Sequence, residues 1–538
     1  MTNNQDWNSS SVLDSLNYLI SKRNDLLVYI KNILNDYHQL DKSEEYYNLL
    51  LGDWLYQFSH QFYMRWHEGY NYKYEDNNIY IYNVDNKYQF NEYRKTREFF
   101  KNINKLIFHY KNNLEFNIHI IKNNQFSLSS KNVKLKTKAK EILNSSIFNP
   151  VGKEFLMYIP LQRNSNYDFY KNTYKWRSWF GLINENRDLE ASKASSDIDK
   201  SWRTSFVLSN KNPSDFLNVF KNILPLFIPN NLLESFFDYR KIVLNNNQFS
   251  PKVLYTSSGL HFDLGFSILA AELKENGTKL VCHQHGGNYG IDYLHATEIY
   301  ESSCVDRFYT WGWVPKNNKR PNIFKPLSVP NQTLKLKSKI NNILLCITDY
   351  DSTGTRIHFQ PMGKKIMDMH NDVIYFLQNL KINSKLIIRM PKQEYSLNIL
   401  EKMKETEKIY GIDNSKITKY NYPSFSYSKS SIVVHSYLCT SFLETLAIDI
   451  PTICFYDNTI YKFRDDALPF IRDLEDVGII YNSPIEASKF INQIESNINS
   501  WWNSPNVIQA RVNFKSNYAN FSNKWYNEWY DEFQSLIN

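Results

Sequence analysis

The residues best suited to acid–base chemistry lie together in one glycine-rich stretch, residues 283–290, which reads His-Gln-His-Gly-Gly-Asn-Tyr-Gly. His283 and His285 are two residues apart, so an extended segment would place both side chains on one face. Together with Gln284 they could donate hydrogen bonds to hydroxyl or phosphate groups, and a neutral histidine could accept a proton. The stretch follows an apolar run that we expect to form a strand, so these side chains should lie at a strand end.

Glycine is scarce in this chain, with 15 in 538 residues, yet three of them fall in this stretch. Gly286 and Gly287 allow positive φ and close approach of the backbone to a ligand. We therefore interpret the stretch as a ligand-binding turn. The alternative is a tight turn that holds a histidine for structural reasons. A metal site is not expected, because the two histidines lack an obvious third ligand and the chain has no suitable cysteine pair.

A second candidate site lies where a polar turn leads from an apolar strand into a helix. The unpaired amides of a helix N-terminus and the hydroxyls of Thr440 and Ser441 suit a phosphate group. Glu444, one turn further on, could hold ribose hydroxyls, and His435 and Ser436 at the strand end belong to the same predicted site. The alternative is structural, because Ser441 and Glu444 have the spacing of a capping box. Both interpretations can hold together.

Two loops supply cations that could reach the same phosphate. The run Arg389-Met390-Pro391-Lys392 follows a predicted strand, and arginine suits bidentate contact with phosphate. Residues 348–356, which end in Arg356, follow another predicted strand and form a polar loop that could close over a ligand. We expect Arg356, Arg389 and Lys392 to contact the ligand, although each alone is a weak indication because surface cations are common.

The composition excludes several classes of protein. Hydrophobic residues make up 42% and aromatic residues 16%, which is typical of folded domains and excludes general disorder. The net charge of +8 is mild; it fits acidic ligands such as nucleotides or anionic glycans and does not predict binding to nucleic acid. Five cysteines without a CxxC pair indicate a reducing compartment. With no signal-peptide pattern and no apolar stretch of about 18 residues, we expect a cytoplasmic protein, with peripheral contact at the inner membrane as an option.

Apolar periodicity divides the chain into four parts. Residues 1–315 begin with helices and continue as alternating strands and helices, and residues 316–340, rich in proline and lysine, are typical of a linker. Residues 341–490 form a second strand–helix series, and residues 491–538 form a helical tail. The predicted fold class is therefore α/β, with two Rossmann-like domains facing a cleft, an N-terminal helical region and C-terminal helices.

Short apolar runs carry the strand predictions. They lie at 155–160, 253–256, 280–283, 308–311, 343–347, 386–389, 432–435 and 452–455. Residues 71–95, rich in asparagine and tyrosine, are expected to form a loop with one short strand at 79–82.

Four motifs, in this order, resemble those of bacterial surface-carbohydrate transferases. In particular the chain resembles a large, mostly uncharacterised family of leptospiral type, which is related to the capsule Kdo and nonulosonic-acid glycosyltransferases. The motifs are SEEYY with LLGDWL at 43–55, QHGG with YG at 284–290, DRFYTWGW at 306–313, and TSFLE running into IPT at 440–452. The resemblance implies a GT-B glycosyltransferase fold that needs no metal and no cofactor beyond a CMP-sugar as co-substrate.

The resemblance also implies a reaction, the transfer of a nonulosonic acid of Kdo, pseudaminic or legionaminic type from a CMP-activated donor to a bacterial surface glycan. Relatives that use CMP-sugars hold the donor phosphate with a Ser/Thr pair at a helix start, which Thr440 and Ser441 match. Many relatives carry a His-Pro pair where this chain has the run 389–392. Because of this departure, a transferase that uses another activated donor, such as CDP-glycerol or a UDP- or GDP-sugar, is the second alternative. A third alternative is a glycan-binding protein without catalysis, whose aromatic side chains stack on sugars.

A sugar transferase of this kind needs a group that activates the acceptor hydroxyl. Carboxylates and histidines of the first domain are the candidates. We rank His285 first, then Glu298, then Asp263, which is close to His261 in the sequence. Asp306 begins a strand and is expected to be structural. The predicted partners are a nucleotide-sugar donor and a surface-glycan acceptor.

Overall fold

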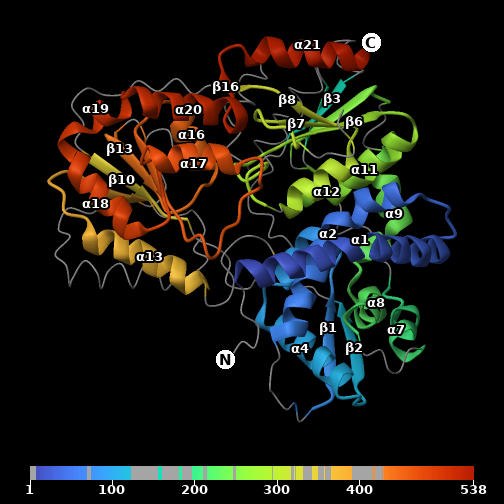
Figure 1. The fold of residues 1–538 in the computed structure, drawn as a ribbon. Coiled ribbons are helices and arrows are strands. Elements are labelled where there is room, and N and C mark those ends of the chain that lie inside the picture. The colour runs from blue at the N-terminus through green and yellow to red at the C-terminus, as the bar shows by residue number, and fades with distance from the viewer. Residues whose placement is uncertain are drawn as a thin grey trace.

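The computed structural model describes a large part of the chain. The described residues are 8–68, 74, 76–122, 155–159, 181–184, 197–209, 215–245, 250–257, 259–293, 295–316, 320, 323–330, 342–348, 357, 365–389, 416–418, 427 and 429–538. Two predicted site residues, Arg356 and Lys392, lie outside them. Figure 1 shows three groups of elements: a mainly helical region that carries the N-terminus, and two α/β domains beside each other above it.

The N-terminal region is built on two long helices, α1 (Ser9–His38) and α2 (Glu44–Glu68). The side chain of Asn8 begins α1 by accepting hydrogen bonds from the amides of Ser10 and Ser11. Phe58 of α2 is fully buried at the centre of an aromatic core. Around these helices lie β1 (Asn78–Asn83), α3 (Lys87–Tyr93), α4 (Arg97–Lys111), β2 (Asn117–Lys122), α7 (Lys200–Ser209), α8 (Phe216–Phe227), η3 (Asn230–Leu232) and α9 (Phe236–Asn245).

Helix α3 departs from the expected loop at 71–95, although the short strand predicted there is confirmed as β1. The asparagine and tyrosine content suggested a loop. Asn86, however, stands at the N-cap, and its side chain accepts a hydrogen bond from the amide of Gln89. A residue type that disfavours helix interiors thus begins this helix.

The first α/β domain contains a six-stranded sheet in which every pair of neighbouring strands is parallel. Its order is β4-β3-β5-β6-β7-β8. On one face lie α10 (Gly259–Phe262), α11 (Leu264–Glu275) and α12 (Ala296–Cys304) (Figure 1). The strands are β3 (Phe155–Ile159), β4 (Gly181–Asn184), β5 (Val253–Thr256), β6 (Lys279–His283), β7 (Arg307–Thr310) and β8 (Phe324–Pro326).

The second α/β domain contains a parallel sheet with the order β12-β11-β10-β13-β14-β15. The strand order reverses between β10 and β13, and ligands of such sheets bind at the carboxyl ends beside that switch. The strands are β10 (Asn342–Cys346), β11 (Lys385–Arg389), β12 (Lys416–Thr418), β13 (Ile432–His435), β14 (Thr452–Phe455) and β15 (Ile480–Tyr481). The helices are α13 (Lys365–Asn379), α16 (Thr440–Ala447), α17 (Leu468–Asp476), α18 (Pro484–Ile494), α19 (Ile498–Trp502) and α20 (Pro505–Tyr518), with the single turn η4 (Glu495–Asn497).

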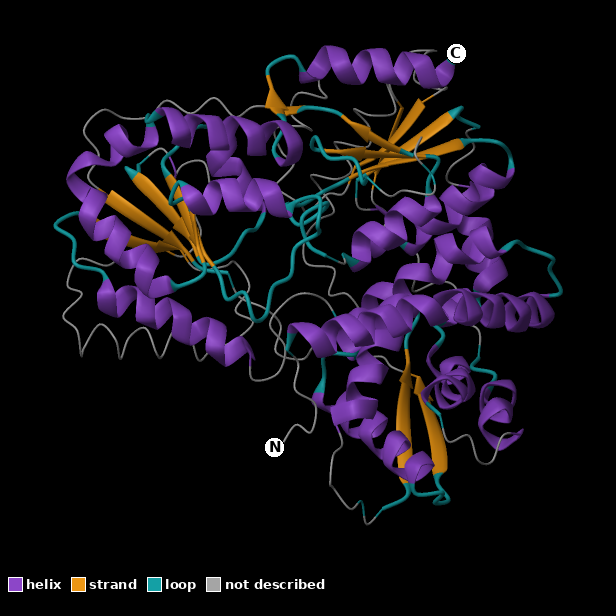
Figure 2. Cartoon of the chain, viewed as in Figure 1, coloured by secondary structure: helices purple, strands orange, loops and turns teal. Residues whose placement is uncertain are grey.

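The C-terminal segment returns to the first domain. After α20 the short strand β16 (Phe521–Ser522) pairs with β9 (Val329–Pro330), and α21 (Trp525–Ile537) covers the face of the first sheet opposite α11 and α12 (Figure 2). Trp529 of α21 is fully buried against Tyr255 and Tyr309 of that sheet. The α/β fold with two Rossmann-like domains and C-terminal helices that the sequence predicts is confirmed.

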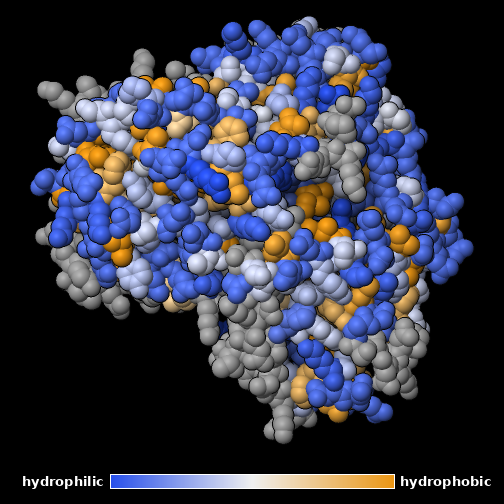
Figure 3. All heavy atoms as spheres, in the orientation of Figure 1, coloured by the Kyte–Doolittle hydropathy of each residue, from blue (hydrophilic) through white to orange (hydrophobic). Residues whose placement is uncertain are grey.

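The face of the molecule that Figure 3 shows is mainly polar. Figure 3 shows hydrophilic residues over most of the visible face, with small groups of apolar side chains between them. Among helices of the described residues, none is both long enough and apolar enough to pass through a lipid bilayer.

Candidate active site

The glycine-rich turn and the start of α16 meet at the junction of the two domains. The amide of Gly287 donates a hydrogen bond to Oγ1 of Thr440, at 2.9 Å. A Cβ on Gly287 would lie 2.7 Å from the backbone nitrogen of Thr440, which is closer than real Cβ atoms approach backbone. Gly286 and Gly287 do not have positive φ. Glycine is therefore needed at 287 for close approach to α16 and not for an unusual backbone conformation.

This packing gives a direct prediction. Gly287→Ala is expected to lower Tm, because the new Cβ must push the turn away from α16, at a cost of about 1–3 kcal/mol. Gly286→Ala is the matched control, since its Cβ would meet only Oγ1 of Thr440 at 3.4 Å, an ordinary contact. Scanning calorimetry of the two variants measures the difference. Equal Tm values would contradict the close packing of Gly287 on Thr440.

The first two residues of the turn anchor it to the tryptophan motif at 311–313. Oε1 of Gln284 accepts hydrogen bonds from the backbone amide of Trp311 and the indole of Trp313, both at 2.8 Å, and its amide donates to the carbonyl of Gly286. The indole of Trp311 donates to Nε2 of His283 at 2.9 Å. Burial lowers the pKa of His283 to about 3, so this ring is neutral. These contacts show His283 and Gln284 holding the turn in place.

His283 and His285 do not share a face, which corrects the expectation from their spacing. Strand β6 ends at His283, whose ring contacts Trp529 of α21 on one side of the sheet. His285 lies beyond the strand end, and its ring contacts His261 of α10 on the other side. The alternation of a strand does not continue into the turn.

His285 forms the outer end of a buried chain of ionisable groups. Its Nδ1 is 3.4 Å from Oε1 of Glu301 and 3.1 Å from the hydroxyl of Tyr289, which itself donates to Oε2 of Glu301 at 2.8 Å. Nε2 of His261 lies 2.8 Å from Oε1 of Glu301, and its Nδ1 lies 2.9 Å from Oδ1 of Asp53. The acceptors around Nδ1 of His285 favour the tautomer that carries its proton there, which makes Nε2 the basic nitrogen.

The other two candidate bases are held by structural partners. Glu298 accepts from the amide of Gly290 at 2.8 Å and from the guanidinium of Arg464, across the domain junction, at 2.7 Å. Asp263 is the N-cap of α11 and accepts from the amide of Phe266 at 3.0 Å. Both carboxylates are buried. Of the three candidates, His285 is the one whose surroundings match a carboxylate-oriented histidine base.

A further group of contacts ties the two domains together beside the turn. Tyr437 donates to Oδ1 of Asp292 at 2.9 Å, and Asn288 donates to Oδ2 of the same carboxyl at 3.1 Å. Asp292 is 1% exposed, and this burial raises its pKa to about 7. An acid that titrates near neutral pH therefore lies in the junction between the domains.

On the second domain, the predicted capping box at the start of α16 is wrong. The N-cap is Cys439, without a side-chain cap bond, so Ser441 stands inside the first turn. Oγ of Ser441 lies 2.9 Å from the thiol of Cys439 and 3.2 Å from Nδ1 of His435. The hydroxyl of Thr445 donates its proton to a backbone carbonyl, so it must accept from Nε2 of His435. The other ring nitrogen, Nδ1, therefore carries no proton and accepts from Ser441. The first amides of α16 thus have no capping side chain, which the anion-binding interpretation needs.

The remaining residues that were predicted to bind the donor gather at the carboxyl edge of the sheet. Ser436, at the switch point, accepts from the amide of Thr348 after β10 at 2.8 Å. Arg389, at the end of β11, donates to the hydroxyl of Tyr427 at 3.3 Å, and Tyr427 donates to Glu444 of α16 at 3.4 Å. Burial lowers the pKa of His435 to about 3, with Arg389 adding to the effect. The structure therefore brings His435, Ser436, Thr440, Ser441, Glu444 and Arg389 together.

Sequence reasoning missed Glu301 and gave Asp53 no functional role. Glu301 lies one helical turn after Glu298 on α12, and this spacing was the one available signal that a second carboxylate faces the turn. The described residues contain no group of three or more His, Cys, Asp or Glu side chains arranged to hold a metal ion.

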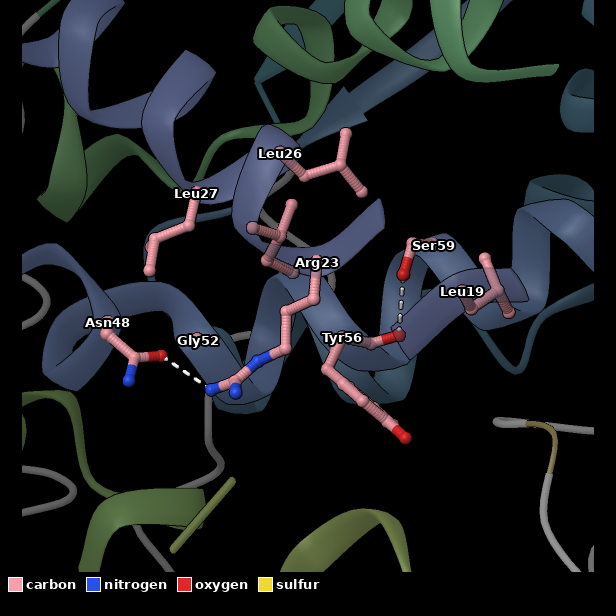
Figure 4. A pocket seen from close by; sticks show the side chains of 9 residues that line it. Leu19, Arg23, Leu26, Leu27, Asn48, Gly52, Tyr56 and Ser59 are labelled. Atoms are coloured by element: carbon pink, nitrogen blue, oxygen red, sulfur yellow. Dashed lines mark hydrogen bonds between the residues drawn. The ribbon is translucent and has the colours of Figure 1, made fainter. Parts of the chain in front are cut away.

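A pocket outside the predicted site lies between α1 and α2 (Figure 4). At one side of it, Arg23 donates to Oδ1 of Asn48 at 2.9 Å and to the hydroxyl of Ser303 at 2.8 Å. Gly52, the neighbour of Asp53, also lines it. The remaining lining residues are Leu19, Leu26, Leu27, Leu55, Tyr56 and Ser59.

Known structures resemble this chain only remotely. Anabaena Alr3699/HepE, solved with UDP and glucose, has a TM-score of 0.41 and 9% identity, with 71% of this chain and 99% of that chain covered. MurG from Acinetobacter baumannii has a TM-score of 0.38 and 9% identity over the same shares. The wall teichoic acid polymerase TagF, solved with CDPG, has a TM-score of 0.36 and 10% identity, with 72% and 90% covered. These likenesses are too distant to support an argument about function.

The sequence itself gives the assignment. No curated protein matches it. The model of one family, described as LIC12162 family transferase, matches residues 3–533, which is nearly the whole chain. The protein is therefore a transferase that belongs to the LIC12162 family.

Proposed function

We propose that this transferase is a glycosyltransferase that moves a nonulosonic acid, of Kdo, pseudaminic or legionaminic type, from a CMP-activated donor to a bacterial surface glycan. The observation that carries the proposal is the meeting of two halves at the domain junction. His285, held beside Glu301, is followed by a glycine turn that packs on the uncapped start of α16. A base and an anion site in such proximity suit the attack of a hydroxyl on an activated sugar.

The first half of the reaction is activation of the acceptor. Nε2 of His285 takes the proton of the acceptor hydroxyl, while Glu301 and Tyr289 hold Nδ1–H. The hydroxyl oxygen then forms a bond to the anomeric carbon. The bond between that carbon and the phosphate oxygen breaks, and its electron pair leaves with CMP. Glu301 stabilises the imidazolium that results.

The second half is stabilisation of the leaving phosphate. The amides of the first turn of α16 and the hydroxyl of Thr440 receive the negative charge, and the hydroxyl of Ser441 turns from Nδ1 of His435 to the phosphate when the donor binds. Arg389 adds positive charge at the end of β11, and Glu444 holds the ribose hydroxyls. We extend the same role in phosphate binding to Arg356 and Lys392. The proposal includes no metal ion and no cofactor, because the helix start and the cations supply the charge.

A panel of activated donors tests this proposal. We expect release of CMP from one of CMP-Kdo, CMP-pseudaminic acid or CMP-legionaminic acid in the presence of an acceptor glycan. Ser441→Ala is expected to lower this turnover about 10- to 150-fold, because it removes one hydrogen bond to a charged group, worth about 1.5–3 kcal/mol. Thr445→Ser, one helical turn away, keeps its hydroxyl and serves as the control.

Two results would contradict the CMP-sugar assignment. Thermal stabilisation by UDP, GDP or CDP-glycerol and not by CMP would indicate another activated donor, which the run at 389–392 keeps open. Saturable glycan binding without any nucleotide affinity would indicate a binding protein. We place the reaction in the cytoplasm, with peripheral contact at the inner membrane, and membrane flotation of the intact protein tests that contact.

A further inference from the structure

We propose that Asp53, His261 and Glu301 form a buried relay that positions His285 and keeps its carboxylate partner ionised. These three side chains are called the relay below. The inference rests on the proposed role of His285 as the base and adds three positioning residues to it. One of them, Asp53, belongs to the N-terminal helical region, so that region becomes part of the catalytic machinery.

The relay is drawn from separate elements that converge behind the turn. Asp53 lies on α2, His261 on α10 and Glu301 on α12, and their exposed fractions are 4%, 3% and 0%. His261 stands in the middle, with Nδ1 2.9 Å from Asp53 and Nε2 2.8 Å from Glu301. Both ring nitrogens therefore face carboxylate oxygens. A neutral imidazole has one N–H and could donate to only one of them, whereas an imidazolium donates to both.

The charges follow from this arrangement. Burial alone would favour a neutral acid at Glu301, which is fully buried. Although burial raises the pKa of Glu301, His285 and His261 lower it to about 2. Although burial lowers the pKa of His261, Asp53 and Glu301 raise it to about 9. At neutral pH the relay is thus an imidazolium between two carboxylates, and it carries one net negative charge toward His285.

Other ionisable groups surround the relay. Lys87 of α3 donates to Ser267 at 3.1 Å, and burial lowers its pKa to about 8. Cys304 of α12 is buried near Lys87, and burial raises the pKa of its thiol to about 11. Tyr289 donates to Glu301 from the turn, and Gln57 donates to Asp53 from the next turn of α2. The positive charge of Lys87 acts on Asp53 and offsets the net negative charge of the relay.

Removing His261 should therefore act on His285 through Glu301. Without the imidazolium, the buried carboxyl of Glu301 has lost a compensating charge and tends to take up a proton. A protonated Glu301 no longer fixes the Nδ1–H tautomer or stabilises the imidazolium that catalysis forms at His285. A merely structural bridge between α2, α10 and α12 would instead change stability and leave the tautomer of His285 as it is.

The experiment uses the full-length protein labelled with ¹⁵N-histidine, together with steady-state kinetics on whichever CMP-sugar in the panel is turned over. The variants are His261→Gln and Asp53→Asn, which keep side-chain size. His38→Gln is the matched control, because His38 is also buried in this region but hydrogen-bonds the carbonyl of Leu232 and lies outside the relay.

We expect both ring nitrogens of His261 to be protonated at neutral pH and His285 to populate mainly the Nδ1–H tautomer. In His261→Gln the tautomers of His285 should mix, kcat should fall at least about tenfold, and the donor KM should stay within about twofold. Asp53→Asn should show the same changes to a smaller extent, and it decides the question if His261→Gln does not fold. His38→Gln should show neither change.

A neutral His261 ring at neutral pH, or a kcat in both relay variants equal to that of the wild type, would overturn the relay. The spectra are read on the protein itself and need no turnover. If no donor in the panel is consumed, the proposed function fails, and the tautomer of His285 in the two variants still decides whether the relay acts on it.

Discussion

Replacing His285 with glutamine is expected to lower kcat by about 10²–10⁴-fold, the usual contribution of a positioned general base, with little change in the donor KM. Glutamine keeps a side-chain amide that can donate to Glu301, so the turn should hold its shape. It cannot take a proton from the acceptor hydroxyl near neutral pH. His285 has a side-chain exposure of 14% and supports no large part of the core, so the fold should survive the change.

The matched comparison is Glu298→Gln, which tests the second-ranked base by the same chemistry. Loss of the Glu298 carboxylate should weaken its hydrogen bond with Arg464 across the domain junction, and it should lower kcat much less than His285→Gln does. Circular dichroism of both variants confirms folding before kinetics. Turnover retained in His285→Gln and abolished in Glu298→Gln would contradict the assignment and make Glu298 the base.

The fold was predictable where one local pattern suffices. The run Val253–Thr256 is short, buried along its whole length and mainly apolar, and it forms a parallel strand covered on both faces, as does Ile432–His435. The placement of α21 was not predictable. Its tryptophans indicate a buried helix, but the sequence does not say which of two similar sheets they cover.

For the candidate site, the sequence indicated which segments meet and did not indicate which residues contact each other. The turn at 283–290 and the helix at Thr440 were found from glycine clustering and a strand–turn–helix pattern. The contact between these two segments, through Gly287, joins residues of different domains, so no local sequence pattern indicates it. For the same reason the contacts of His261 with Asp53 and Glu301 escaped detection. The capping-box error at Ser441 arose because the helix begins at Thr440, which shifts the N-cap to Cys439.

The second large effect concerns pH and the junction between the domains. Asp292→Asn is expected to remove a loss of stability that the wild type suffers as pH rises. Burial raises the pKa of Asp292 from 3.8 to about 7 in the folded protein, so between these values the folded state holds a proton that the unfolded state has released. The contribution of Asp292 to the free energy of unfolding is fully present below about pH 4 and is lost as the pH rises toward 7. The shift of about three units corresponds to about 4 kcal/mol in total.

Urea unfolding of wild type and Asp292→Asn at about pH 5 and about pH 7.5 measures this effect. Between the two conditions, the free energy of unfolding of the variant should rise by about 2–3 kcal/mol relative to that of the wild type. Taking the difference between the two proteins cancels the contributions of all other titrating groups. Tyr437→Phe should act in the opposite direction, because it removes the hydroxyl that donates to the ionised carboxyl, so its stability should fall more steeply with pH than that of the wild type. A difference between Asp292→Asn and wild type that does not change with pH would mean that Asp292 is already ionised at about pH 5. The hydrogen bonds from Tyr437 and Asn288 would then outweigh the burial of the carboxyl, and the junction would not respond to pH through this residue.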